Sequence, residues 1–210
     1  MYYTCLALLG ITMAVGLWSY RSLSDAMRVL AWLATAGVLV EAVAWIITYT
    51  GGLNHVAYNL FTLIDGLFVW LIYRKLSGKF SGLSIGMVVL WLLFICVNVV
   101  FIQNDQTFFS NNIISASLFE ILMALAYFKM LLELPPKQSL FSIPGFWFSS
   151  ALLIYQSVTF FRWTVVLQSE VAQLQRFFMH VNEWAVMVQL VVWIYVFRLD
   201  AANHGKPAHA

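Results

Sequence analysis

Long apolar runs separated by short polar breaks dominate the pattern along this chain of 210 residues. Seven such runs occur, and each is close to the ~20 residues that an α-helix needs to cross a bilayer. The polar breaks between them are too short to hold a soluble domain. The pattern therefore predicts an all-α, polytopic membrane protein, a bundle of seven transmembrane helices at about 2–20, 29–50, 55–73, 82–103, 111–132, 143–163 and 177–198.

The composition also indicates a lipid-exposed surface. The chain is 62% hydrophobic and only 10% charged, whereas a soluble domain carries about 25% charged residues. We expect a single transmembrane domain over residues 1–200 and a flexible cytoplasmic tail over residues 201–210. The net charge of +2 is small and the basic residues are scattered, which argues against nucleic acid as a partner. The lipid bilayer is the first partner that this composition predicts.

Lysine and arginine are distributed unevenly among the predicted loops. Arg162 and Arg176 fall near the sixth loop, and the other basic residues fall in or beside the first, third and fifth loops or the tail. Cytoplasmic loops of membrane proteins carry the excess of positive charge. The distribution therefore predicts an N-terminus outside and a C-terminus in the cytoplasm, in an inner (cytoplasmic) membrane.

Four acidic residues, Glu41, Asp65, Glu120 and Glu183, lie inside predicted membrane helices. A charged side chain near the bilayer centre costs a few kcal/mol on insertion scales, so it usually faces the bundle interior and often marks a functional site. The alternative is that these carboxyl groups are neutral and only hydrogen-bond between helices. We expect Glu41, Asp65 and Glu120 near mid-depth, as buried acids that couple occupancy or protonation to helix packing, and Glu183 in the outer half.

Polar residues form stripes on three of the predicted helices, because residues three or four apart share a helix face. Such stripes occur in the third, sixth and seventh segments. If they converge, they form a polar cavity that opens outward and narrows to carboxyl groups at mid-depth. The predicted ligand-binding residues are His55, Tyr58, Asn59, Asp65, Tyr155, Gln156, Arg162, His180 and Glu183.

His180 and Glu183 also have the spacing of two metal ligands on one helix face. His55, Glu41 or Glu120 would have to complete such a site. A zinc hydrolase normally uses three histidines, or two and a clear acid, and only two histidines lie in the predicted helices. No nucleotide-binding fingerprint or nucleophile elbow is present in the sequence. We therefore assign no catalytic residue and no cofactor, and keep a metal-dependent intramembrane enzyme as an alternative.

Two segments, NHVAYNLFTLIDGLFVWLIYRKL and PGFWFSSALLIYQSVTFFRW, carry a resemblance. They resemble segments of a group of uncharacterised small bacterial seven-helix membrane proteins, some associated with sensor histidine kinases as neighbours or as fused input domains. The resemblance covers about a fifth of the chain. It implies a sensing or signalling role and allows no catalytic residue to be carried over.

These observations favour an integral membrane receptor or sensory module that binds a small ligand and signals through a cytoplasmic or membrane partner, such as a kinase. A small proton-coupled transporter is the first alternative, because intramembrane carboxyl groups and histidines are the parts of a proton relay. The lack of proline inside the predicted helices counts against it, since many transporters use broken helices. A structural subunit of a larger membrane complex is a further alternative.

Overall fold

The computed structural model describes residues 2–78, 83–103, 110–133, 139–166 and 171–204. Within these ranges all regular structure is helical, and each apolar run of the sequence corresponds to one helix. The helices are α1 (Tyr2–Trp18), α2 (Asp25–Tyr49), α3 (His55–Ser77), α4 (Leu83–Val97), α5 (Ser110–Glu133), α6 (Pro144–Phe161) and α7 (Ala172–His204). Turns of π-helix continue α4 over Asn98–Ile102 and α6 over Arg162–Val166. The predicted all-α fold class is confirmed.

Five segments in the described part of the chain are long and apolar enough to cross a membrane. They are α2, α3, the segment Ile85–Ile102, α5 and α7. α1 is apolar but has only 17 residues. α6 has 18 residues, among them serine, tyrosine, glutamine and threonine, and is not one of the five. The chain therefore has the make-up of a multi-pass membrane protein.

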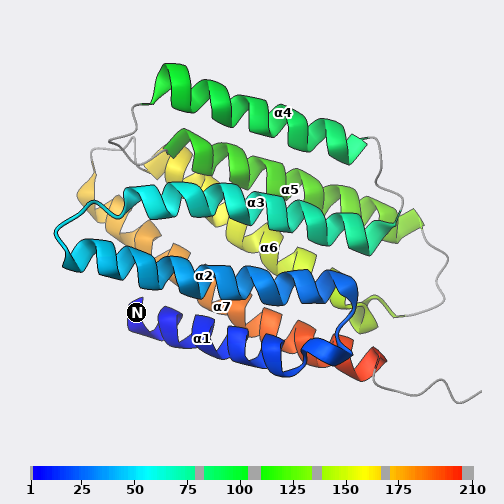
Figure 1. The fold of residues 1–210 in the computed structure, drawn as a ribbon. Coiled ribbons are helices and arrows are strands. Elements are labelled where there is room, and N and C mark those ends of the chain that lie inside the picture. Colours follow the sequence, from blue (N-terminus) through cyan, green and yellow to red (C-terminus); the bar gives the residue numbers. More distant parts are fainter. Residues whose placement is uncertain (1, 79–82, 104–109, 134–138, 167–170, 205–210) are drawn as a thin grey trace, which may run out of the picture.

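Consecutive helices run antiparallel, so one end of the bundle carries the first turn of α1 and the opposite end carries the last turn of α7 (Figure 1). α2 packs on α3, α5 packs on α6, and α6 packs on α7. α1 packs against both α2 and α7. α4 lies at the edge of the bundle and packs mainly against α5 (Figure 1).

Fully buried side chains pack tightly in the half of the bundle that contains the start of α2 and the ends of α3 and α7. Leu30, Tyr73, Phe148 and Phe197 are fully buried there. The Tyr73 ring lies 5.6 Å from the Phe148 ring, and the Tyr73 hydroxyl donates to Ser149 Oγ at 3.1 Å. Aromatic and aliphatic side chains interlock in this half of the bundle. Dispersion attraction between their closely packed atoms stabilises the helix packing.

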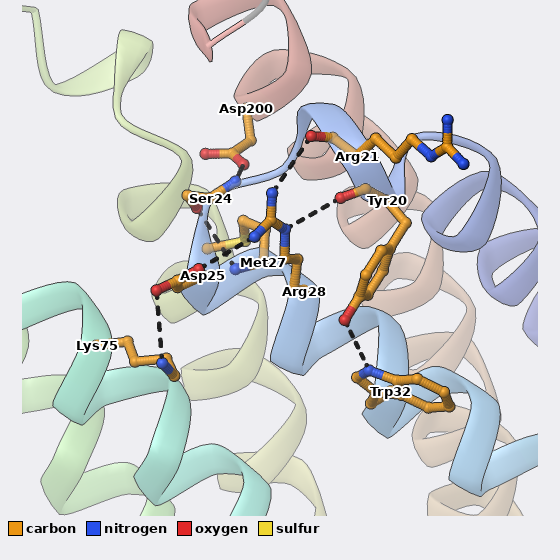
Figure 2. A network of polar contacts seen from close by, with 9 residues as sticks. All are labelled: Tyr20, Arg21, Ser24, Asp25, Met27, Arg28, Trp32, Lys75 and Asp200. Atoms are coloured by element: carbon orange, nitrogen blue, oxygen red, sulfur yellow. Dashed lines mark hydrogen bonds and ion pairs between the residues drawn. The ribbon is translucent and has the colours of Figure 1, made fainter.

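A polar network closes the same end of the bundle (Figure 2). Asp200 on α7 accepts a hydrogen bond from the backbone N–H of Ser24, just before α2, at 2.7 Å. Asp25, in the first turn of α2, pairs with Arg28 at 3.3 Å and with Lys75 on α3 at 3.7 Å. The network ties the start of α2 to the ends of α3 and α7.

The first four residues of the predicted tail belong to α7. α7 continues through residues 201–204, where the sequence analysis placed the start of the tail. Asn203 Nδ2 donates to the backbone oxygen of Ser142 at 3.0 Å, and His204 Nδ1 lies 3.1 Å from the backbone oxygen of Asp200. The first contact holds the last turn of α7 against the residues just before α6, and the second lies within α7. Residues 205–210 lie outside the described residues.

Candidate functional site

A cavity of about 350 Å³ lies between α1, α2, α3, α6 and α7, in the half of the bundle away from the Ser24–Asp200 network. Its volume falls in the range of ordinary small-molecule sites, about 300–1,000 Å³. Polar and apolar side chains share its wall. The lining residues are Tyr2, Cys5, Leu6, Leu9, Leu33, Ala34, Gly37, Val40, Glu41, Tyr58, Phe61, Asp65, Tyr155, Asn182, Glu183, Val186, Gln189, Leu190 and Trp193.

Glu41 lies at the end of the cavity nearest the first turns of α1 and α3. The hydroxyl groups of Tyr2 and Tyr58 both donate to its Oε2, at 3.0 Å and 3.2 Å. Glu41, which we predicted near mid-depth, is thus joined to residues in the first turns of α1 and α3. The sequence analysis also missed Tyr2, because α1 has few polar residues and Tyr2 lies at its first position.

Asp65 lies two turns beyond Tyr58 on the same face of α3, about 10 Å further along the helix. It lines the cavity and forms no hydrogen bond or ion pair with the described residues. It is close enough to Tyr155 on α6 and to Glu120 on α5 to interact with both electrostatically. The predicted stripe from Tyr58 to Asp65 therefore does face the bundle interior.

Glu183 lines the cavity from α7 and is paired with His180 one turn earlier, at 3.1 Å between Oε2 and Nδ1. His180 is mostly exposed and does not line the cavity. Arg162, in the π-helical turn after α6, lies close enough to Glu183 to interact electrostatically. Its guanidinium lies 5.5 Å from the centroid of the Trp163 ring. Of the acids that line the cavity, Glu183 is therefore the one that forms an ion pair among the described residues.

Glu120 belongs to a second polar centre between α5 and α6, outside the cavity wall. Gln156 Nε2 donates to Glu120 Oε2 at 2.6 Å, and Ser117 Oγ donates to Gln156 Oε1 at 2.9 Å. All three side chains are buried. The second carboxyl oxygen of Glu120 has no hydrogen-bond partner among the described residues. Gln156 was predicted to line the ligand pocket, but it turns toward α5.

The residues that line the cavity differ in part from the predicted ligand-binding residues. His55 and Asn59 lie on α3 but are not among the residues that line the cavity. Asn182, Gln189 and Trp193 do line it and were missed, although they continue the face of α7 that carries Glu183. Extending the spacing rule from Glu183 through Val186 would have found Gln189 and Trp193, whereas Asn182 is adjacent to Glu183 in sequence.

The metal site considered for His180 and Glu183 lacks further ligands in the described part of the chain. No group of three or more His, Cys, Asp or Glu residues in that part is arranged to hold a metal ion. The two residues alone provide an exposed histidine paired with a half-buried carboxyl group.

The cavity combines carboxyl groups, tyrosine rings and an apolar wall, an arrangement suited to holding a small molecule that has both polar and apolar parts. Such a wall can bind a ligand by charge, hydrogen bonds and ring contacts. No protein-family model, no curated protein and no solved structure matches the chain.

Proposed function

We propose that the chain is an integral membrane receptor or sensory module that binds a small ligand in the cavity. The observation that carries this proposal is the asymmetry of the bundle, with a cavity in one half and a tightly packed core in the other. A ligand in this cavity contacts five helices at once. Its binding therefore favours one packing of those helices over others, and a change in packing is what a sensor transmits.

The proposed topology has seven membrane-spanning helices, an N-terminus outside and a C-terminus in the cytoplasm of an inner membrane. It is supported by the basic residues at the ends of helices opposite Tyr2, among them Arg21, Arg74 and Arg198. In this orientation the cavity lies in the outer half. A signalling partner, such as a kinase or another subunit, would then contact the cytoplasmic end.

The test is a thermal-shift screen of the purified full chain with small cationic, neutral and anionic compounds. Gly37→Leu should fill the cavity, because a Cβ at Gly37 already lies 3.4 Å from Leu9 Cδ1. Gly86→Leu is the matched control, because nothing lies within 4 Å of a Cβ at Gly86 on α4. A compound that binds the cavity at 100 times its Kd stabilises the fold by about 2.7 kcal/mol.

The expected result is a compound that raises the Tm of the wild type and of Gly86→Leu by several degrees and leaves the Tm of Gly37→Leu unchanged. If every compound that binds shifts all three proteins alike, or if none binds, the receptor proposal fails. A partner that co-purifies with the chain, and whose activity changes with that compound, would complete the sensory role.

A small proton-coupled carrier is the second candidate, and one observation favours it. Polar groups continue inward from the cavity, from Asp65 to the fully buried Glu120 and its partner Gln156. The test is proton or solute flux in proteoliposomes, with Asp65→Asn and Glu120→Gln as variants. Flux that both variants abolish would replace the receptor proposal, whereas a wild type without flux excludes the carrier.

A further inference from the structure

We propose that the cavity binds a small organic cation, with its ammonium group against Glu41 and Asp65 and its apolar body toward Leu190 and Trp193. This inference rests on the proposed ligand-binding function and names the chemical class of the ligand. It follows from the charges, the aromatic rings and the shape of the cavity.

The wall of the cavity carries acidic side chains without matching basic ones. Glu41, Asp65 and Glu183 line it, and none of the lining residues in the described part of the chain is Lys, Arg or His. Glu183 has His180 at 3.1 Å and Arg162 nearby, but Glu41 and Asp65 form no ion pair with the described residues. A desolvated carboxylate without a cationic partner is strongly unfavourable. A positively charged ligand is therefore the electrostatic complement of this wall.

Aromatic rings surround the same two acids. The hydrogen bonds from Tyr2 and Tyr58 to Glu41 hold both tyrosine rings beside that carboxyl group. Tyr155 lies near Asp65, and Phe61 lines the wall one turn before Asp65 on α3. Aromatic faces attract ammonium groups by about 0.5–2 kcal/mol each. Small metal cations instead prefer a shell of six or more oxygen ligands, so this mixed wall favours an organic ammonium group.

Toward the tightly packed half of the bundle, the cavity wall is apolar apart from Gln189. Leu9, Leu33 and Leu190 line it there, and Trp193 follows Glu183 by ten residues on α7, about 15 Å along the helix. Trp193 is only 6% exposed, so its ring forms part of the buried apolar end of the cavity. The wall therefore fits an elongated ligand with a charged head and an apolar body.

The first test compares three probes of similar shape and different charge, namely phenethylammonium, 2-phenylethanol and phenylacetate. Equilibrium dialysis against the full chain in nanodiscs, corrected for empty nanodiscs, measures their binding. The cation should bind at least tenfold more tightly than either other probe. Glu41→Gln and Asp65→Asn should each weaken its binding about tenfold, whereas the control Glu133→Gln should not, because Glu133 is exposed at the end of α5.

The second test uses Cys5, whose thiol lines the cavity, in a Cys96→Ala background. It compares the rates at which a cationic and an anionic methanethiosulfonate reagent modify Cys5. Glu41→Gln should lower the cationic-to-anionic rate ratio severalfold, because the carboxylate concentrates cations near the thiol. Glu133→Gln should leave the ratio unchanged. Comparing variants removes the intrinsic difference in reactivity between the two reagents.

Different results would overturn the cation inference and the receptor proposal. If a neutral or anionic compound binds in a manner that Gly37→Leu abolishes, while phenethylammonium has no advantage and the Cys5 rate ratio is insensitive to Glu41→Gln, the cation inference is overturned and the receptor proposal stands. If no compound of any charge binds in a cavity-dependent manner, the proposed function itself fails.

Discussion

The two carboxyl oxygens of Glu120 have different surroundings. Oε2 accepts a hydrogen bond from Gln156 at 2.6 Å, while Oε1 has no hydrogen-bond partner among the described residues, and no ion pair with Glu120 is found there either. Full burial without a cationic partner makes a negative charge at this position unfavourable. Glu120 therefore contributes to the stability of the fold through its acceptor oxygen and not through a negative charge.

Glu120→Gln should leave the stability of the protein unchanged or raise it. The amide keeps an acceptor oxygen for Gln156 Nε2 and removes a charge that has no partner. Glu120→Ala should lower the free energy of unfolding by about 1–3 kcal/mol, because it leaves the buried Gln156 amide without its acceptor. Thermal unfolding in detergent, followed by tryptophan fluorescence, measures both. Equal losses of stability for the two variants would contradict this role of the acceptor oxygen.

At the scale of the helices, Trp91 is the side chain that joins α4 to its neighbours. Its ring stacks on Phe119 of α5, with centroids 4.9 Å apart and an interplanar angle of 7°. The outer edge of its six-membered ring, at Cη2, Cζ2 and Cζ3, lies against Gly66 of α3, where a Cβ would collide with it. The absence of a side chain at Gly66 therefore makes the space that Trp91 occupies. A single ring of α4 therefore contacts both α3 and α5 at the edge of the bundle.

Gly66→Ala should destabilise the protein by about 1–3 kcal/mol, because the added methyl group displaces the Trp91 ring from its stack on Phe119. The loss should be smaller in a Trp91→Leu background, where the ring is gone, and a double-mutant cycle measures this coupling. Gly86→Ala is the control, since its position on α4 is open. An equal effect of Gly66→Ala in both backgrounds would show that Trp91 is not the obstacle.

The helices could be predicted from the sequence because each apolar run is long enough to require burial in lipid or protein. The cavity could be predicted only in part. Tyr58 and Asp65 meet there because they share a face of α3, and the spacing rule identifies a shared face. Tyr155 and Gln156 are adjacent in sequence, but successive residues point about 100° apart on a helix, so one lines the cavity and the other turns to Glu120.

The contact between Tyr2 and Glu41 shows what spacing on one helix cannot predict. These residues are 39 positions apart, and their contact depends on where α1 packs against α2. The order of packing around a bundle depends on the fit of many side chains, which no local pattern contains. The Ser24–Asp200 contact is of the same kind, since it joins residues 176 positions apart.

At the scale of the whole molecule, the two ends of the bundle differ in their chemistry. One end is held by the Asp25, Lys75 and Asp200 contacts and lies beside the fully buried core (Figure 2). The other end carries the hydrogen bonds to Glu41 and the His180–Glu183 pair. A ligand from outside reaches the second end only if the N-terminus is also outside. The proposed function therefore depends on the orientation of the protein in the membrane.

The orientation can be measured with single cysteines in a Cys5→Ala, Cys96→Ala background. Thr50 and Ala202 are exposed residues at the ends of α2 and α7, which lie at opposite ends of the bundle (Figure 1). Thr50→Cys should react with a membrane-impermeant maleimide in right-side-out spheroplasts, and Ala202→Cys should react only after permeabilisation, because the excess of Lys and Arg lies at the end that carries Ala202. The reverse pattern would place the Glu41 end of the cavity in the cytoplasm and make its ligand an intracellular one.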